Sequence, residues 1–95
     1  MNLKFQWDAR KAAANAAKHG VTFAEALTAF ADPLAHIFPD ADHSITEERE
    51  IIIGHSKNNR LLIVCFTERA DAVRIFSARR VTKQERNDYE ENTKS

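Results

Sequence analysis

The chain has 95 residues, a mass of 10.8 kDa and a formal net charge of zero, with 14 basic and 14 acidic residues. A chain of this length buries one modest core, so we expect a single domain over residues 1–95 and no multidomain machinery. Apolar residues make up 43% and charged residues 29%, which is typical of a globular domain. The balanced charge excludes a uniformly basic, histone-like surface.

The sequence gives no sign of membrane insertion or secretion. The longest apolar run, Leu61 to Phe66, is too short to cross a bilayer, and the first eight residues lack the apolar segment of a secretory signal. The single cysteine, Cys65, cannot form an internal disulfide, and we expect it to be an inert thiol in the core. We therefore expect a cytoplasmic protein that does not contact a membrane.

The first third of the chain predicts a pair of helices. Asp8 is a good N-cap and Gly20 suits a left-handed C-terminal cap, so the alanine-rich segment 9–18 between them is expected to be helical. Its alanines form a small apolar face. The polar side carries three residues at helical spacing: Lys11, Asn15 and Lys18. Thr22 and Glu25 then form a capping box for a second helix, which ends at Asp32-Pro33.

The rest of the chain predicts strands and one more helix. Four segments have strand patterns: 34–38, 50–56, 61–67 and 73–78. The alternating segment Phe5-Gln6-Trp7 is either an edge strand or an N-terminal arm. Thr82–Glu85 is a second capping box and opens a C-terminal helix whose only large apolar residue is Tyr89. We expect an α+β fold, with the helix pair packed on an antiparallel sheet of about four strands and followed by the C-terminal helix.

The turn between the last two strands decides which side chains share a face of the sheet. A two-residue loop at Ala70-Asp71 predicts three cross-strand pairs: Arg69 with Ala72, Thr67 with Arg74, and Cys65 with Phe76. Thr67, Arg69 and Arg74 would then lie on one face. A three-residue loop would reverse the faces and pair Glu68 with Arg74. Both loop lengths stay open, because no Gly or Asn defines the turn type.

Positive charge concentrates in the second half of the chain. Residues 60–86 contain seven basic residues, six of them arginine, against three acidic ones. The guanidinium group presents a planar fork of donors that suits phosphate or carboxylate. The segment indicates an anion site for nucleic-acid phosphate or, equally, a solvated surface balanced by acidic neighbours.

Two residues near the helix pair offer acid-base chemistry. His19 ends the first helix, where an imidazolium suits the helix dipole, and its imidazole is equally a candidate general acid or base. Glu25 is a candidate general base, although its capping-box position already accounts for it. The residues alone favour the structural role for both. We expect no metal site and no cofactor, because His36, His43 and His55 lack the spacing of metal ligands and two glycines cannot form a phosphate loop.

A series of motifs along nearly the whole chain resembles one protein family. The segments that carry the resemblance are 5–8, 18–26, 32–34, 47–49, 53–54, 60–64, 67–69, 74–75 and 77–82, together with Lys11, Asn15 and Phe30. In this order, over about 80 residues, they resemble the BrnT toxins of type II toxin–antitoxin systems, which share the RelE/ParE-like fold. One departure is Ala70-Asp71, which stands where the family pattern has a Gly-Asp turn.

The resemblance implies an activity and a partner. The activity is metal-independent endoribonuclease cleavage of RNA, in which a ribose 2′-oxygen attacks the adjacent phosphate and cationic groups stabilise the developing charge. Translation and growth would be inhibited. The implied partner is a BrnA-like antitoxin, a ribbon–helix–helix DNA-binding protein that neutralises the toxin and brings the complex to operator DNA.

The resemblance also implies roles for individual residues. The expected catalytic residues are His19, Glu25, Thr67, Arg74, Ser77 and Arg79. Among them, Arg74 and Arg79 would grip the scissile phosphate, His19 would act as acid or base with Glu25 as its rival, and the two hydroxyl residues would position the substrate. The expected RNA contacts are Lys18, Arg69, Arg80 and Lys83.

Two other functions stay open at the level of sequence. A ParE-like toxin would act on a protein target such as DNA gyrase, and a fold does not determine which of these activities a domain has. A domain without catalytic activity would bind the antitoxin and serve as co-repressor.

Overall fold

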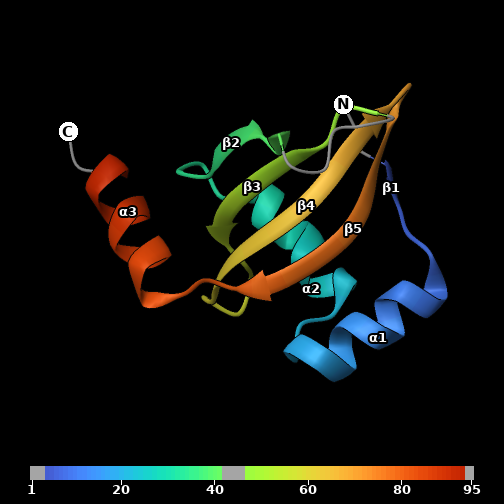
Figure 1. Cartoon of the computed structure of the whole chain (residues 1–95), viewed down its shortest axis with the longest axis horizontal. Helices are drawn as coiled ribbons and strands as arrows, with labels where there is room; N and C mark the ends of the chain where they lie inside the picture. Colours follow the sequence, from blue (N-terminus) through green and yellow to red (C-terminus); the bar gives the residue numbers. More distant parts are fainter. Residues whose placement is uncertain (1–3, 42–46, 94–95) are drawn as a thin grey trace.

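A computed structural model describes residues 4–41 and 47–93 of the chain. The elements in chain order are β1 (Lys4–Gln6), α1 (Ala9–His19), α2 (Phe23–Ala26), the 3-10 helix η1 (Leu27–Ala31), β2 (His36–Pro39), β3 (Glu50–His55), β4 (Leu61–Arg69), β5 (Ala72–Arg80) and α3 (Lys83–Thr93). The strands form one sheet in the order β1-β5-β4-β3-β2. α1 and α2 lie together on one side of this sheet, and α3 lies apart from them (Figure 1).

The sheet has five strands in its described part, rather than about four, and it is not wholly antiparallel. β1 pairs in parallel with the first residues of β5, whereas all other neighbours are antiparallel as predicted. The first segment is therefore an edge strand that precedes the helix pair. Its three residues are too few for periodicity to identify, and its partner strand lies more than sixty residues away in the sequence.

The second predicted helix is short and its capping box is only half formed. α2 has one turn of α-helix and continues as η1. Thr22 Oγ1 accepts a hydrogen bond from the Glu25 amide at 3.0 Å, as the pattern predicts. The Glu25 carboxylate, however, turns away from the Thr22 amide to Ser56 and Arg60. A guanidinium forms stronger, charge-assisted bonds than a backbone amide does, which explains the difference.

The first helix buries a face that matches the predicted one only in part, since Ala12 packs against the core. Its caps are as expected, but Asn15 is buried while Ala13 and Ala17 are exposed. The Asn15 amide nitrogen donates to the carbonyls of Ala78 and Val21 at 2.7 and 3.0 Å, and its oxygen accepts from the Ala78 amide at 3.1 Å. The Asn15 side chain thus forms hydrogen bonds with the backbone at the edge of β5, beyond the point where β1 stops pairing with this strand.

The core lies between the helices and one face of the sheet. Its buried residues are Val21, Phe23, Ala26, Ile52, Leu62, Val64, Phe66, Val73, Ile75 and Ala78. Trp7 packs edge-on against Phe23 with ring centroids 5.9 Å apart, as expected of a core anchor. Gly54 allows β3 to approach η1 closely, because a Cβ at this position would lie 2.9 Å from the Ala29 carbonyl oxygen.

The hairpin between β4 and β5 has the two-residue loop. Two predicted pairs are confirmed: Arg69 with Ala72, and Thr67 with Arg74. Ala70 adopts a φ of 50°, the left-handed conformation that glycine would adopt without strain. The third predicted pair is wrong, because a bulge after Cys65 places Ser77 opposite it and leaves Phe76 as the extra residue of β5.

The C-terminal helix has the predicted cap and the predicted single anchor. The Thr82 amide donates to Glu85 Oε1 at 2.8 Å, and the Glu85 amide donates to Thr82 Oγ1 at 3.2 Å, so this capping box is complete. Tyr89 is buried. In the described part of the chain, no helix is long and apolar enough to span a membrane.

Candidate functional site

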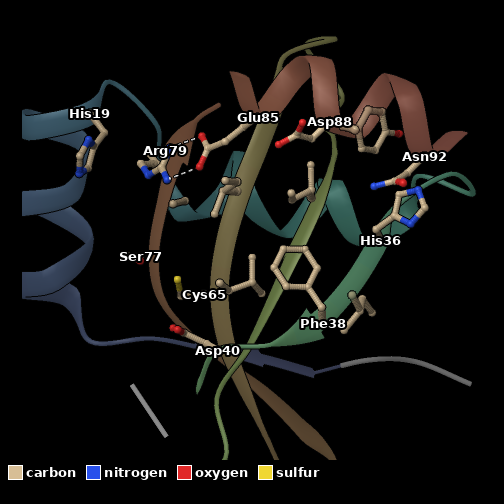
Figure 2. Close-up of a pocket in the computed structure, with 16 residues that line it drawn as sticks. His19, His36, Phe38, Asp40, Cys65, Ser77, Arg79, Glu85, Asp88 and Asn92 are labelled. Atoms are coloured by element: carbon tan, nitrogen blue, oxygen red, sulfur yellow. Dashed lines mark hydrogen bonds and ion pairs between the residues drawn. The ribbon is translucent and has the colours of Figure 1, made fainter. Parts of the chain in front are cut away.

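The face of the sheet opposite α1 and α2, here called the open face, contains a groove of about 760 Å³. Its floor is formed by Ile51, Ile53, Ile63, Cys65 and Ser77, and its walls carry residues of β2 and α3 (Figure 2). Cys65 therefore lines the groove instead of lying in the core, contrary to the prediction. The floor is mainly apolar, contains residues of β3, β4 and β5, and lies on the face of the sheet that α1 and α2 do not cover.

Arg79 occupies the α3 end of the groove. Figure 2 shows its side chain between His19 of α1 and Glu85 of α3. The two terminal nitrogens of Arg79 donate to the two carboxylate oxygens of Glu85 at 2.8 and 2.9 Å. These bonds lower the pKa of Glu85 to about 2 and raise the pKa of Arg79. An anion at Arg79 must therefore compete with the Glu85 carboxylate, which is ionised at neutral pH, or share the arginine with it.

Four cations, which we call the cationic cluster, gather along the hairpin half of β5: Lys11, Arg49, Arg69 and Arg74. Arg69 is paired with Glu47, whose carboxylate oxygens lie 2.9 and 3.0 Å from its Nη2. The hydrogen bond from Arg69 lowers the pKa of Glu47, and the charges of Arg49 and Arg74 lower it further. The strand register places Arg74 opposite Thr67, two residues along β4 from Arg69.

Arg74 differs from the other predicted arginines in this region. Over residues 4–41 and 47–93, no hydrogen bond or ion pair engages its guanidinium group. Its charge and that of Lys11 contribute to lowering the pKa of Asp8, although the largest cause there is the backbone bond from Lys11. Because both Arg69 and Arg79 are already bound to carboxylates, Arg74 is the arginine of this face with the most donors available for an anion.

The two predicted hydroxyl residues are placed differently. Ser77 lies on the groove floor, between Arg74 and Arg79 along β5. Thr67 is buried opposite Arg74, and its hydroxyl donates to the carbonyl oxygen of Glu48. Thr67 thus ties the segment before β3 to β4, whereas Ser77 faces the groove.

Glu25 does not join this group. Its carboxylate accepts hydrogen bonds from Arg60 Nε at 2.9 Å and from Ser56 Oγ at 2.7 Å, and the residue is 5% exposed. The bonds from Arg60 are the main cause that lowers the pKa of Glu25 to about 2, with a smaller contribution from Ser56. Arg60 also donates to the carbonyl of Gly20. The network therefore joins the turn between the first two helices to the β3–β4 connection.

The remaining predicted RNA contacts flank the α3 end of the groove. Lys18 is in the last turn of α1, Arg80 is the last residue of β5, and Lys83 is the first residue of α3. All three are exposed. Apart from Glu25, the predicted residues thus form two groups, one at the hairpin end of β5 and one near the α3 end of the groove, with Ser77 between them along β5.

Three residues of this region were not among the predicted site residues: Lys11, Arg49 and Phe76. Lys11 and Arg49 lie outside the arginine-rich stretch 60–86 that indicated the site. Phe76 was expected to face Cys65, and only the bulge places it elsewhere. Within the described residues, no three His, Cys, Asp or Glu side chains lie together as metal ligands, and His43 is outside those residues.

Comparison with known proteins identifies the family. Residues 7–85 match the family model described as the ribonuclease toxin BrnT of type II toxin–antitoxin systems. The structure is similar to the crystal structure of the Brucella abortus ribonuclease toxin BrnT, with a TM-score of 0.66 and 28% sequence identity, covering 86% of this chain and 100% of that chain. A search of curated proteins gives no match. The chain therefore belongs to the BrnT family of ribonuclease toxins of type II toxin–antitoxin systems.

Proposed function

We propose that this chain is a toxin that cleaves RNA without a metal ion, by attack of a ribose 2′-oxygen on the adjacent phosphate. The observation that carries the proposal is Arg74, whose guanidinium has no ion-pair partner in the described part of the chain and stands among three further cations. Membership of a family named for its ribonuclease toxins supports the same activity.

The scissile phosphate is proposed to bind over Ser77. This residue lies between Arg74 and Arg79 on β5, so a phosphate there is within reach of both long side chains. Arg74 has the donors for a bidentate contact, and Arg79 contributes a cation that Glu85 partly neutralises. In the transition state, negative charge grows on the non-bridging oxygens, and these guanidinium groups stabilise it.

His19 is the proposed general base. It lies beside Arg79 in the lining of the groove (Figure 2), and imidazole is the side chain that most often acts as a general base. His19 takes the proton of the 2′-hydroxyl, the oxygen attacks phosphorus, and the bond to the 5′-oxygen breaks. The products are a 2′,3′-cyclic phosphate and, once the leaving oxygen is protonated, a 5′-hydroxyl end. Glu25 is the weaker candidate because a carboxyl group with a pKa of about 2 is a poor base.

The test is cleavage of RNA by the purified protein in the presence of EDTA, with the chemical nature of the new ends determined. We expect 2′,3′-cyclic phosphate ends, and we expect Arg74→Ala to slow cleavage by about 100-fold or more without lowering the Tm. Arg86→Ala is the matched control, because it removes one exposed arginine of α3 outside the proposed site. The proposal fails if RNA stays intact both alone and with ribosomes, or if Arg74→Ala cleaves at the wild-type rate.

The same protein is proposed to be neutralised in the cytoplasm by a BrnA-like ribbon–helix–helix antitoxin, which also carries the complex to operator DNA. Three large apolar side chains on and next to β2 support a protein partner, because they remain exposed in the isolated chain: Leu34 (60%), Ile37 (54%) and Phe38 (40%). Co-expression with the product of the adjacent reading frame tests this proposal. We expect a stable complex that does not cleave RNA, and recovery of the toxin alone would contradict it.

A further inference from the structure

The bulge in β5 places an aromatic side chain among the cations of the cationic cluster. Phe76 has no partner residue on β4, because it is the extra residue between the pairs formed by Ile75 and Ser77. Its ring is not part of the core between helices and sheet, and the residue is only half-buried. The main chain is thus irregular at the residue that carries this ring. Packing of the ring in the core does not explain the irregularity, because the ring is not in the core.

The cations that face Phe76 come from two other parts of the fold. The central carbon of the Arg49 guanidinium lies 3.9 Å from the ring centroid, and the Lys11 ammonium lies 5.5 Å from it. Both contacts are cation–π interactions, in which a positive group lies over the negative face of the ring. Arg49 immediately precedes β3 and Lys11 belongs to α1, so only the tertiary fold brings them to the same ring.

An aromatic ring bordered by cations is the arrangement that binds single-stranded nucleic acid. A nucleobase stacks on the ring, and the cations bind the phosphates on either side of that nucleotide. In this chain Phe76 immediately precedes Ser77 in β5 and is two residues from Arg74. A phosphate over Ser77 therefore has a nucleobase within reach of Phe76.

We propose that Phe76, together with Arg49 and Lys11, forms a binding site for one nucleobase of the RNA. The base stacks on the Phe76 ring where the Lys11 ammonium lies in the free protein, and Arg49 remains on the ring. Lys11 is the group that moves, because its contact is the longer one and its side chain is flexible, and it then pairs with a flanking phosphate. The location of the neighbouring phosphate rests on the proposed function.

Stacking depends on ring area and not on a hydrogen-bond pattern, so the site accepts any base and binds a purine more tightly than a pyrimidine. The alternative is that the cation–π contacts only shield the Phe76 ring from solvent. In that case, removal of a base would not change the affinity for RNA, and the experiment measures this affinity.

The experiment uses oligonucleotides with 2′-O-methyl riboses, which lack the attacking hydroxyl and therefore stay intact. Binding to the full chain is measured by fluorescence anisotropy, with a series in which one position at a time is abasic. We expect one abasic position to weaken binding to the wild type by about tenfold. We expect Phe76→Leu to bind the intact oligonucleotide about tenfold more weakly, and to show no additional loss at that abasic position.

Two variants separate stacking from charge. Phe76→Tyr keeps a ring and is expected to restore both the affinity and the dependence on the base. Arg74→Gln removes a phosphate contact, so it is expected to lower the salt dependence of binding by about one unit of slope, which Phe76→Leu leaves unchanged.

A spectroscopic measurement does not depend on the folding of the leucine variant. In a Trp7→Phe background, Phe76→Trp provides a single indole at this position. We expect the intact oligonucleotide to quench its fluorescence and the oligonucleotide with the critical abasic position to quench it much less. Equal quenching by the two oligonucleotides would overturn the inference.

The remaining outcomes separate this inference from the proposed function. If unmodified RNA is cleaved but no abasic position weakens binding, the ribonuclease proposal stands and the nucleobase site is wrong. If binding depends on the base through Phe76 but RNA is not cleaved, the site stands and the catalytic proposal fails. If the wild type does not bind the oligonucleotides, the nucleobase site is wrong, and the cleavage assay alone decides the ribonuclease proposal.

Discussion

Arg74 and Arg79 show how strongly the neighbours of an arginine change the positive charge that it offers to an anion. Both are arginines of β5 that the resemblance to the BrnT toxins implies as contacts of the scissile phosphate. Glu85 binds Arg79 through two hydrogen bonds, whereas Arg74 has no such carboxylate among the described residues. The same residue type therefore offers a cation with no bound carboxylate among the described residues at one position and a partly neutralised cation at the other, and the two should contribute unequally to anion binding.

Glu85→Gln tests the neutralisation of Arg79. The amide keeps an oxygen that can accept from the Thr82 amide, but it no longer offsets the guanidinium charge, so we expect RNA to bind about three- to tenfold more tightly at low salt. Affinity is measured with the non-cleavable oligonucleotide at two salt concentrations. Glu91→Gln on the exposed side of α3 makes the same change in net charge, and an equal gain in that control would mean that Arg79 plays no specific part.

Asn15 provides a second residue-scale prediction, on stability. Asn15→Ala leaves the amide and carbonyl of Ala78 without their side-chain partner in a buried place, and we expect the free energy of unfolding to fall by about 2–3 kcal/mol. Urea denaturation measures the change. Asn87→Ala, at an exposed position of α3, should change the free energy of unfolding by less than about 0.5 kcal/mol. A similar small change for Asn15→Ala would contradict the bonding described here.

At the scale of elements, α3 is attached to the domain at few points. The Tyr89 hydroxyl lies 3.4 Å from Asp32 Oδ2 and 3.2 Å from the Leu34 carbonyl oxygen, and the rings of His36 and His55 pack edge-on against the tyrosine with centroids 5.5 and 5.6 Å away. Burial is the main cause that raises the pKa of Tyr89. Apart from this side chain and the Arg79–Glu85 pair, the helix is highly polar, so it has little to bury.

Tyr89→Ala is therefore expected to release α3 locally and leave the sheet folded. Hydrogen exchange should become at least about tenfold faster for the amides of residues 83–93, while protection of β3, β4 and β5 stays unchanged. Tyr89→Phe retains the ring packing and should have a smaller effect. Parallel loss of protection in the sheet would show that α3 belongs to the same cooperative unit.

At the scale of the whole molecule, several carboxylates are held in ionised form by their partners. The pKa values of Glu25 and Glu85 are lowered to about 2 by their arginines. Those of Asp8, Asp32 and Glu47 are also lowered. A carboxyl group that binds its proton more weakly in the folded chain than in the unfolded one stabilises the fold above its ordinary pKa, and this contribution is lost as the pH falls.

We therefore expect the free energy of unfolding to decrease as the pH falls from about 4.5 towards 2, the interval between the ordinary and the folded pKa of Glu25. Glu25→Gln should be less stable at neutral pH, with a Tm about 5 °C lower, and should lose less stability over that interval. Denaturant unfolding at a series of pH values measures both curves. Curves that remain parallel down to pH 2 would show that the Glu25–Arg60 pair does not stabilise the fold.

Local features of this protein were accessible from its sequence. The caps at Asp8, Gly20 and Thr82 depend on residues within one turn, and the first two pairs of the β4–β5 hairpin follow from a loop of two residues. The motifs that indicated the BrnT family are also short and continuous. Such features are determined by backbone conformation and by neighbours along the chain, and both can be read from a single sequence.

The arrangement of the candidate site was decided by tertiary structure. Asn15 was predicted to be exposed and instead satisfies the edge of β5, and the Glu25 carboxylate left its capping box for an arginine distant in the sequence. The bulge placed Ser77 opposite Cys65, and tertiary packing placed Arg49 and Lys11 over the Phe76 ring. These contacts depend on competition among partners that are far apart in the chain. The sequence therefore determined which chemical groups are present, and only tertiary packing decided which of them are in contact.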